Sequence, residues 1–231
     1  MKLLLITGAS SGIGLACAET FLDNGYRVIN LSRRACPNSA VRSLACDLSS
    51  AGFVDDVAKD ITPELADAEQ ICLIHNASVL TNDAVGTTDS AELRRIYEVN
   101  LIAPNTLNTL CIPHMQTSSS IIYIGSTLSE KAVPNSFSYV TSKHATIGMM
   151  RSTCQDLAGG KIHTACVCPG FTDTQMLRDH VGEESMDFVA GMSAFKRLIE
   201  PDEIASTVLF AASNPVLNGA TIHANLGQVE A

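Results

Sequence analysis

Tyr139 and Lys143 are the two residues whose types and spacing most directly suggest chemistry. They stand four positions apart near the start of a predicted helix, so both side chains lie on one face. A tyrosine ordinarily ionises near roughly pH 10, too high for a base at neutral pH, but a nearby cation favours the phenolate. Lys143 supplies that cation, so the pair can exchange a proton. The same spacing also occurs in amphipathic surface helices, and alone it is a weak signal.

Ser126 adds a third polar group to this pair. It follows the apolar run 121–125, which is typical of a buried strand, and it precedes Tyr139 by thirteen residues. Doubly wound sheets bind their ligands at the carboxyl ends of the strands, where Ser126 should lie. We therefore expect Ser126 to act together with Tyr139 and Lys143.

A glycine-rich segment, 7–14, follows the first predicted strand and opens the first predicted helix. Its glycines stand where the backbone must bend or approach a ligand closely. The free N–H groups and positive dipole at a helix start favour a pyrophosphate, although a glycine loop can also be only a tight turn. The residues expected to hold a dinucleotide there are Gly8, Ser10, Ser11, Gly12, Ile13 and Gly14.

Ser32, Arg33 and Arg34 follow the second predicted strand, where NAD-binding folds usually place an acid for the adenosine ribose hydroxyls. No acid is present. Ser32 leaves room and Arg33 offers a guanidinium fork suited to a 2′-phosphate, which predicts NADP as the cofactor. The alternative is a pair of solvated surface arginines, and Arg34 could supply the contact instead.

Seven apolar runs have the length of strands, and the segments between them are mostly helical or loop-like. Continuous Leu, Ile and Val runs separated by helices indicate strands buried on both faces. The predicted fold class is therefore α/β, a doubly wound parallel sheet (Rossmann fold) with helices on both faces. The predicted strands are 2–7, 27–31, 41–46, 71–76, 120–124, 162–168 and 220–224.

Glycine and proline mark helix ends. Helices are predicted over 13–24, ended by Gly25, and over 137–158, ended by Gly159, because glycine accepts the left-handed helix stop. Pro201 opens another helix. The length and the lack of repeats or linkers predict one domain over residues 1–231.

Composition excludes several classes of function. The net charge of −9 disfavours a nucleic-acid surface, and no apolar run approaches the roughly eighteen residues of a membrane span. The eight cysteines are expected to be reduced thiols in a cytoplasmic protein. Cys166 and Cys168 share a strand face, but no neighbouring ligands complete a site, so we predict no metal.

These motifs, in this order, resemble the short-chain dehydrogenase/reductase family in its single-domain form, and the likeness covers nearly the whole chain. The family's glycine motif corresponds to the segment 7–14, and its Asn-Ala-Gly segment to 76–78. Its catalytic residues correspond to Asn100, Ser126, Tyr139 and Lys143. Further cofactor positions correspond to Asp47 and Leu48 near the adenine, Asn76 and Ala77, and Pro169, Gly170, Thr172 and Thr174 near the nicotinamide.

The resemblance implies a role for each catalytic position. Tyr139 exchanges the proton with the substrate oxygen, which Ser126 hydrogen-bonds and orients. Lys143 favours the phenolate and holds the nicotinamide ribose, and Asn100 helps position a water that relays protons to Lys143. The implied activity is hydride transfer between NADP(H) and the carbonyl or alcohol carbon of a small organic substrate.

The sequence departs from the family pattern in three places. Ser78 replaces the glycine of the Asn-Ala-Gly segment, which can change the local backbone. The tail 224–231 lacks the usual valine-aspartate-diglycine run, so the resemblance does not predict which subunit contacts the tail makes. The passage 35–40 is too short for a full helix, is expected to form a loop or one turn, and trims the adenine side of the pocket.

The segment 174–197 corresponds to the family's mobile lid over the substrate, and its methionines suit an adaptable apolar pocket. Ordinary core packing is the alternative for each of its apolar residues, which are Met176, Leu177, Met186, Phe188, Val189, Met192 and Phe195. Relatives pair through the long helices that correspond to 93–115 and 137–158, so a homodimer or homotetramer is expected.

Two histidines stand next to predicted site residues, His75 before Asn76 and His144 after Lys143. His144 should point away from the Tyr139 face, while His75 could touch the cofactor or be a satisfied structural histidine.

A non-catalytic NADP-binding sensor or scaffold of the same fold is the alternative function, but it has no need of a catalytic phenol. Sugar-nucleotide epimerases share the fold but usually carry an added substrate domain.

Overall fold

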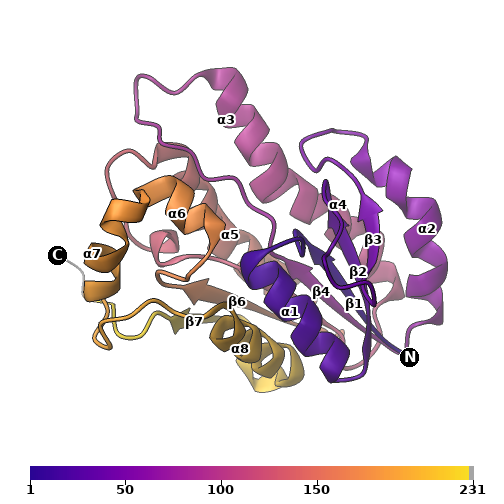
Figure 1. Cartoon of the computed structure of the whole chain (residues 1–231). Helices are drawn as coiled ribbons and strands as arrows, with labels where there is room; N and C mark the ends of the chain where they lie inside the picture. The colour runs from indigo at the N-terminus through magenta and orange to yellow at the C-terminus, as the bar shows by residue number, and fades with distance from the viewer. Residues whose placement is uncertain (229–231) are drawn as a thin grey trace.

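A single seven-stranded parallel sheet runs through the structure, a computed structural model that describes residues 1–228 (Figure 1). The strand order is β3-β2-β1-β4-β5-β6-β7. The strands after β1 are first added on one side of it and then, from β4 on, on the other, so the strand order reverses between β1 and β4. This confirms the predicted doubly wound α/β class. The strands are β1 (Lys2–Thr7), β2 (Tyr26–Ser32), β3 (Arg42–Ala45), β4 (Gln70–His75), β5 (Ser120–Ile124), β6 (His163–Pro169) and β7 (Ala220–Ala224).

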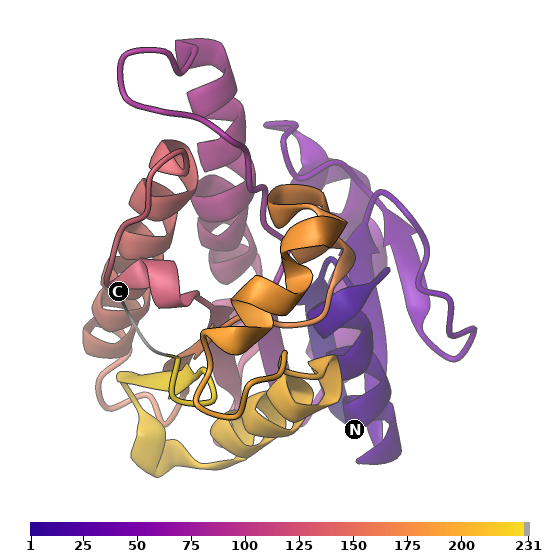
Figure 2. The ribbon, with the colours of Figure 1, turned by 60° about the vertical axis from the view of Figure 1, so that its left-hand side comes forward.

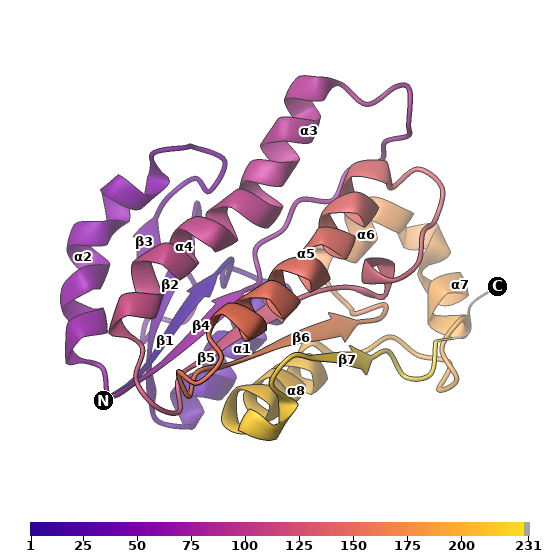
Figure 3. The same cartoon turned by 180° about the vertical axis from the view of Figure 1, so that it is seen from behind.

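Helices cover both faces of the sheet. Helices α1 and α8 lie on one face, and α2, α4 and α5 lie on the other (Figures 1 and 3). The helices are α1 (Gly12–Asp23), α2 (Phe53–Asp67), α3 (Ser90–Tyr97), α4 (Ala103–Cys111), α5 (Phe137–Asp156), α6 (Gln175–Val181), α7 (Met186–Gly191) and α8 (Pro201–Ser213). Among residues 1–228, none of them is long and apolar enough to cross a membrane.

Strand β1 shows why the apolar runs are continuous rather than alternating. Leu3 and Leu5 pack into the core beneath α2, α4 and α5, whereas Leu4 and Ile6 pack into the core beneath α1 and α8. All four side chains are fully buried. Successive side chains of a strand point to opposite faces, so a strand covered on both sides must be apolar at every position.

The predicted helical stretch 93–115 changes type along its length. A π-helical turn, η1 (Glu98–Ile102), separates α3 from α4, and the 3₁₀ turn η2 (Ile112–His114) follows α4. Pro104 has no N–H to give to the main-chain oxygen of Asn100 four residues earlier, which accounts for a departure from regular α-helix here. The π-helical turn contains Asn100, one of the residues singled out from the sequence.

The remaining predicted boundaries shift by a residue or two, which is the usual uncertainty at element ends. The passage 35–40 forms a loop, as expected. Of the tail 224–231, residues 229–231 lie outside the described residues.

Candidate active site

The glycine segment bends at two points of left-handed backbone, Gly8 with φ 74° and Gly12 with φ 55°. Gly14 is required for a different reason, because a Cβ there would lie 2.3 Å from the main-chain oxygen of Gly8. Ser11 occupies the N-cap position of α1, but its side chain makes no capping hydrogen bond within the described residues. The first N–H groups of α1 are therefore available to an anion.

Asn76 and Ala77 hold this glycine segment in place. Their main-chain N–H groups both donate to Thr7 Oγ1, at 3.0 and 2.9 Å, and Asn76 Nδ2 donates to the Gly8 oxygen at 3.1 Å. The backbone at the neighbouring Ser78 does not enter the left-handed region, so serine replaces the family's glycine without that kind of strain.

The end of β2 is linked to the glycine segment through Asn30. Its Oδ1 accepts from the Ala9 N–H at 2.8 Å, and its Nδ2 donates to Ser32 Oγ at 2.9 Å. The Ser32 hydroxyl donates in turn to the Arg34 oxygen at 2.5 Å. The exposed Arg33 follows directly, so its backbone position is fixed relative to the glycine segment.

Asp47 lies near Arg33 at the same end of the sheet. Hydrogen bonds from the Ser49 N–H and hydroxyl lower the pKa of the Asp47 carboxyl, and the nearby positive charges of Arg33 and Arg95 lower it further. The neighbouring Leu48 is buried in the core. The polar groups predicted to surround an adenosine therefore gather on one side of the glycine segment.

Tyr139 and Lys143 lie together on α5, as their spacing predicts. Lys143 Nζ lies 5.4 Å from the centroid of the Tyr139 ring and donates to the main-chain oxygen of Ile124 at 2.7 Å. The two side chains are only 8% and 4% exposed. The lysine thereby connects α5 to the end of β5, next to Ser126.

Asn100 reaches this group through Ser142, a residue that sequence reasoning missed. Asn100 Nδ2 donates to Ser142 Oγ at 2.9 Å, and the Ser142 hydroxyl donates to the main-chain oxygen of Tyr139 at 2.8 Å. Asn100 Oδ1 accepts from the Val79 N–H at 2.8 Å. The Asn100 side chain therefore joins α5 to the segment after β4.

Ser126 begins a short 3₁₀ turn, and Ser129 holds it there. The Ser126 N–H donates to Ser129 Oγ and the Leu128 N–H donates to Ser126 Oγ, each at 3.1 Å. Behind them, the sulfurs of Cys166 and Cys168 lie 3.8 Å apart. Both sulfurs would lie 2.7 Å from a Cβ at residue 125, so only glycine fits before Ser126. Within residues 1–228, no cluster of three or more His, Cys, Asp or Glu residues could hold a metal ion.

The segment 174–197 forms α6 and α7 and lies over the carboxyl ends of β6 and β7 (Figures 2 and 3). Its two ends lie side by side, because Ile199 N–H donates to the Phe171 oxygen and Asp173 N–H donates to the Ile199 oxygen, both at 2.9 Å. Thr174 caps α6 by accepting from the Leu177 N–H at 3.3 Å. The segment leaves and rejoins the fold at one place, next to 169–172.

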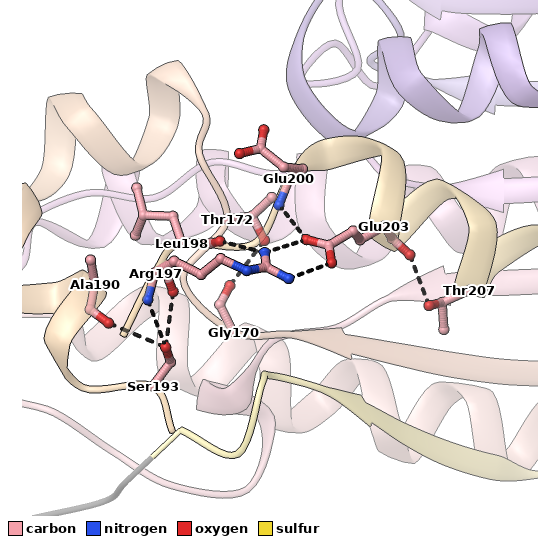
Figure 4. Close-up of polar contacts among 9 residues, drawn as sticks. All are labelled: Gly170, Thr172, Ala190, Ser193, Arg197, Leu198, Glu200, Glu203 and Thr207. Carbon is pink, nitrogen blue, oxygen red and sulfur yellow. Dashed lines mark hydrogen bonds and ion pairs between the residues drawn. The ribbon is translucent and has the colours of Figure 1, made fainter. Parts of the chain in front are cut away.

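Arg197 anchors the far end of this segment to α8 (Figure 4). Its guanidinium donates to both carboxylate oxygens of Glu203, at 2.6 and 2.7 Å, and this pairing lowers the pKa of the Glu203 carboxyl to about 2. The Arg197 N–H donates to the buried Ser193 hydroxyl at 3.2 Å. Neither Arg197 nor Glu203 was predicted as a site residue, since their pairing depends on the tertiary fold.

The apolar residues of this segment divide between core and surface. Met186 and Val189 are buried, which fits ordinary packing. Phe188 and Phe195 are 73% and 69% exposed, and Met176 is 42% exposed. Packing inside the described chain therefore does not account for all of them.

The two histidines lie apart from the Tyr139 group. His75 Nε2 is 2.8 Å from Asn108 Oδ1, and burial lowers the pKa of its imidazole to about 4. His144 is exposed, and its Nδ1 lies 2.9 Å from the Val140 oxygen. These positions agree with the structural alternative for His75 and the outward orientation expected for His144.

Known proteins resemble this chain along nearly its whole length. The family model described as Enoyl-(Acyl carrier protein) reductase matches residues 8–228. Carbonyl reductase family member 4 of Xenopus tropicalis is 29% identical over 94% of each chain. The 3-oxoacyl-[acyl-carrier-protein] reductase FabG of Salmonella typhimurium is 29% identical over 98% of this chain and 96% of its own.

A solved structure shows the same agreement in three dimensions. Ligand-free aldohexose dehydrogenase of Thermoplasma acidophilum superposes with a TM-score of 0.90 at 29% identity, covering 98% of this chain and 93% of that one. The chain thus belongs to the short-chain dehydrogenase/reductase family of oxidoreductases.

Proposed function

We propose that this protein is an NADP-dependent oxidoreductase that transfers a hydride between the nicotinamide and the carbonyl or alcohol carbon of a small organic substrate. The observation that carries the proposal is the buried arrangement of Tyr139 and Lys143 beside the turn that holds Ser126. A phenol, an ammonium and a hydroxyl at the carboxyl edge of the sheet suit general acid/base catalysis beside a bound dinucleotide.

The bound cofactor would carry the hydride, and the protein's own residues would bind it and move the proton. The N–H groups of the segment 8–14 would hold the pyrophosphate. Tyr139 would give its proton to the substrate oxygen during reduction, with Ser126 donating a hydrogen bond to the same oxygen. Lys143 would hold the ribose next to the nicotinamide, and Pro169, Gly170, Thr172 and Thr174 would face the nicotinamide itself.

Asn100 would position a water with its main-chain oxygen rather than its side chain, because the side-chain amide is already bonded to Val79 and Ser142. Its main-chain oxygen lacks the α-helical donor that Pro104 would otherwise provide. That oxygen is suited to accept from a water between Asn100 and Lys143. We propose that protons reach Lys143 through this water.

Cofactor choice rests on Ser32 and Arg33. The Ser32 position holds no carboxylate to bind the ribose hydroxyls of NAD, and the exposed Arg33 guanidinium would be a bidentate donor for a 2′-phosphate. The proposal further includes one catalytic domain over 1–231, a cytoplasmic location and a homodimer or homotetramer, with no nucleic-acid or membrane partner.

The direct test is turnover by the purified protein. NADPH and NADH are each offered with ketones, aldehydes, quinones and acyl thioesters, and the reverse reaction is offered with NADP and alcohols. Oxidation of NADPH by at least one carbonyl class is the expected result. Tight NADPH binding without turnover across the whole panel would instead favour a sensor or scaffold, which the paired Tyr139 and Lys143 argue against.

A further inference from the structure

Asp83 contacts the start of α5 from a loop that is distant in sequence. The main-chain oxygen of Asp83 accepts from the Phe137 N–H, and its Oδ1 accepts from the Ser138 N–H, both at 3.1 Å. Its own N–H donates to the main-chain oxygen of Asn135, also at 3.1 Å. Three hydrogen bonds therefore join this one residue to the chain just before Tyr139.

These bonds complete the helix start. The first N–H groups of an α-helix have no partner within the helix, and Ser136, at the N-cap of α5, makes no side-chain cap within the described residues. Asp83 supplies the missing acceptors from outside the helix. A carboxylate is favoured at this position because it lies at the positive end of the helix dipole.

The Asp83 carboxylate is itself held in place. Its Oδ2 accepts from Thr88 Oγ1 at 3.1 Å. A second contact joins the same loop to α5, because the Thr81 and Ser138 hydroxyls lie 3.3 Å apart. Residues 83 and 136 also form an isolated parallel bridge, so the loop and the helix start run side by side. The contact is built from several bonds rather than one.

The other end of the same loop is fixed to Asn100. The Asn100 side chain accepts from the Val79 N–H at 2.8 Å and donates to the Val79 oxygen at 3.1 Å. The chain from Val79 to Asp83 therefore runs from Asn100 to the first turn of α5. Tyr139 is the next residue after Ser138, so its position depends on both attachments.

We propose that Asp83 is a positioning residue for the reaction: it fixes the first turn of α5, and with it the Tyr139 phenol, relative to the segment held by Asn100. The inference rests on the proposed function, because it assigns Tyr139 the proton transfer. Asp83 itself takes no part in the chemistry. Its effect on rate comes from the placement of Tyr139, and a misplacement of about 1 Å can cost roughly 100-fold in rate.

The test compares Asp83→Ala, Asp83→Asn and the control Asp89→Ala in the full-length protein. Asp89 is an exposed carboxylate on the same loop and makes no side-chain capping bond to α3. Asp83→Ala should lower kcat roughly 10- to 100-fold while the NADPH Kd changes less than about twofold. Asp83→Asn keeps an acceptor for the Ser138 N–H, so it should recover most of kcat, and Asp89→Ala should match the wild type.

A kcat for Asp83→Ala within about twofold of the wild type would overturn the inference, as would equal losses in Asp83→Ala and Asp89→Ala. All variants are assayed at a temperature where circular dichroism shows them folded, which separates positioning from stability. If Asp83→Ala does not fold, Asp83→Ser replaces it, because the shorter side chain cannot reach the Ser138 N–H, and the same outcomes apply.

Amide hydrogen exchange tests the anchor without any turnover. Asp83→Ala should exchange faster at residue 138, whose N–H donates to the carboxylate, than the wild type and Asp89→Ala, with Asp83→Asn in between. Unchanged exchange would overturn the inference even in an active enzyme. A wild-type protein that reduces no carbonyl would instead overturn the proposed function, and the exchange rates would still decide whether Asp83 anchors α5.

Discussion

Lys143 Nζ donates a 2.7 Å hydrogen bond to the main-chain oxygen of Ile124, two residues before Ser126. The ammonium is almost fully buried, and this bond ties α5 to the carboxyl end of β5. The relative positions of Lys143, Tyr139 and Ser126 are therefore set by the fold itself. A site that is arranged before its ligands bind loses less free energy to ordering when they arrive.

Tyr139→Phe should lose nearly all turnover and still bind NADPH, because it removes the proton donor and little of the cofactor surface. General acid/base catalysis contributes roughly 10²- to 10⁴-fold, so kcat should fall by that factor. Steady-state kinetics with NADPH and fluorescence titration of NADPH binding check the two parts. Tyr97→Phe is the matched control, since the Tyr97 hydroxyl also bonds to α5, at Thr141 Oγ1. Turnover above about a tenth of the wild-type rate in Tyr139→Phe would contradict the assigned role.

Self-association should be abolished by Gly148→Arg. Gly148, together with His144 and Ala145, is exposed on the outer face of α5, and nothing lies within 4 Å of a Cβ built at Gly148. The arginine therefore fits the monomer, and replacing a helical glycine should stabilise α5 by up to about 1 kcal/mol. Light scattering at micromolar concentration should give a multiple of 24.5 kDa for the wild type and 24.5 kDa for the variant.

Gly191→Arg is the control for this experiment, because Gly191 is also a helical glycine with open space around it but lies on α7. It should keep the wild-type mass. A wild-type protein of 24.5 kDa would contradict self-association altogether. A Gly148→Arg variant that stays oligomeric would place the interface on another face.

Stability should fall in mild acid because of His75. Burial lowers the pKa of the folded imidazole from 6.5 to about 4, so between these values the unfolded chain binds a proton that the folded chain does not. The resulting stabilisation is complete above pH 6.5 and is lost as the pH falls towards 4. A shift of this size corresponds to roughly 3 kcal/mol in the free energy of unfolding.

Urea unfolding between pH 4 and 7, at one protein concentration, measures this dependence. His75→Gln keeps a donor for Asn108 but has no titrating group, so it should flatten the pH dependence. His114→Gln, on the short turn after α4, serves as the control and should retain the wild-type slope. Equal slopes in wild type and His75→Gln would show that another group is responsible.

The doubly wound α/β fold class and the residues at the strand ends follow from local patterns, and these were predictable. Continuous apolar runs mark strands covered on both faces, and Ser126 and Ser32 follow such runs directly. Asp83, Ser129 and Ser142 could not be found this way, because each acts through a contact between separate segments. Asp83, for example, has no local feature that points to the N–H groups of residues 137 and 138, fifty-odd positions away.

NADPH should be preferred over NADH, and Ser32→Asp together with Arg33→Ala should weaken or reverse the preference. Hydrogen bonds to charged groups contribute about 1.5–3 kcal/mol, so loss of the Arg33 contact should cost roughly ten- to a hundredfold in NADPH specificity. The new aspartate would repel the 2′-phosphate and accept the free ribose hydroxyls of NADH. The measurement is kcat/KM with both cofactors for wild type, the double variant and Arg34→Ala. Arg34→Ala should behave as wild type if Arg33 makes the contact, whereas a selective loss there would assign the contact to Arg34. Equal wild-type values, or a preference for NADH, would show that Ser32 and Arg33 do not select NADP.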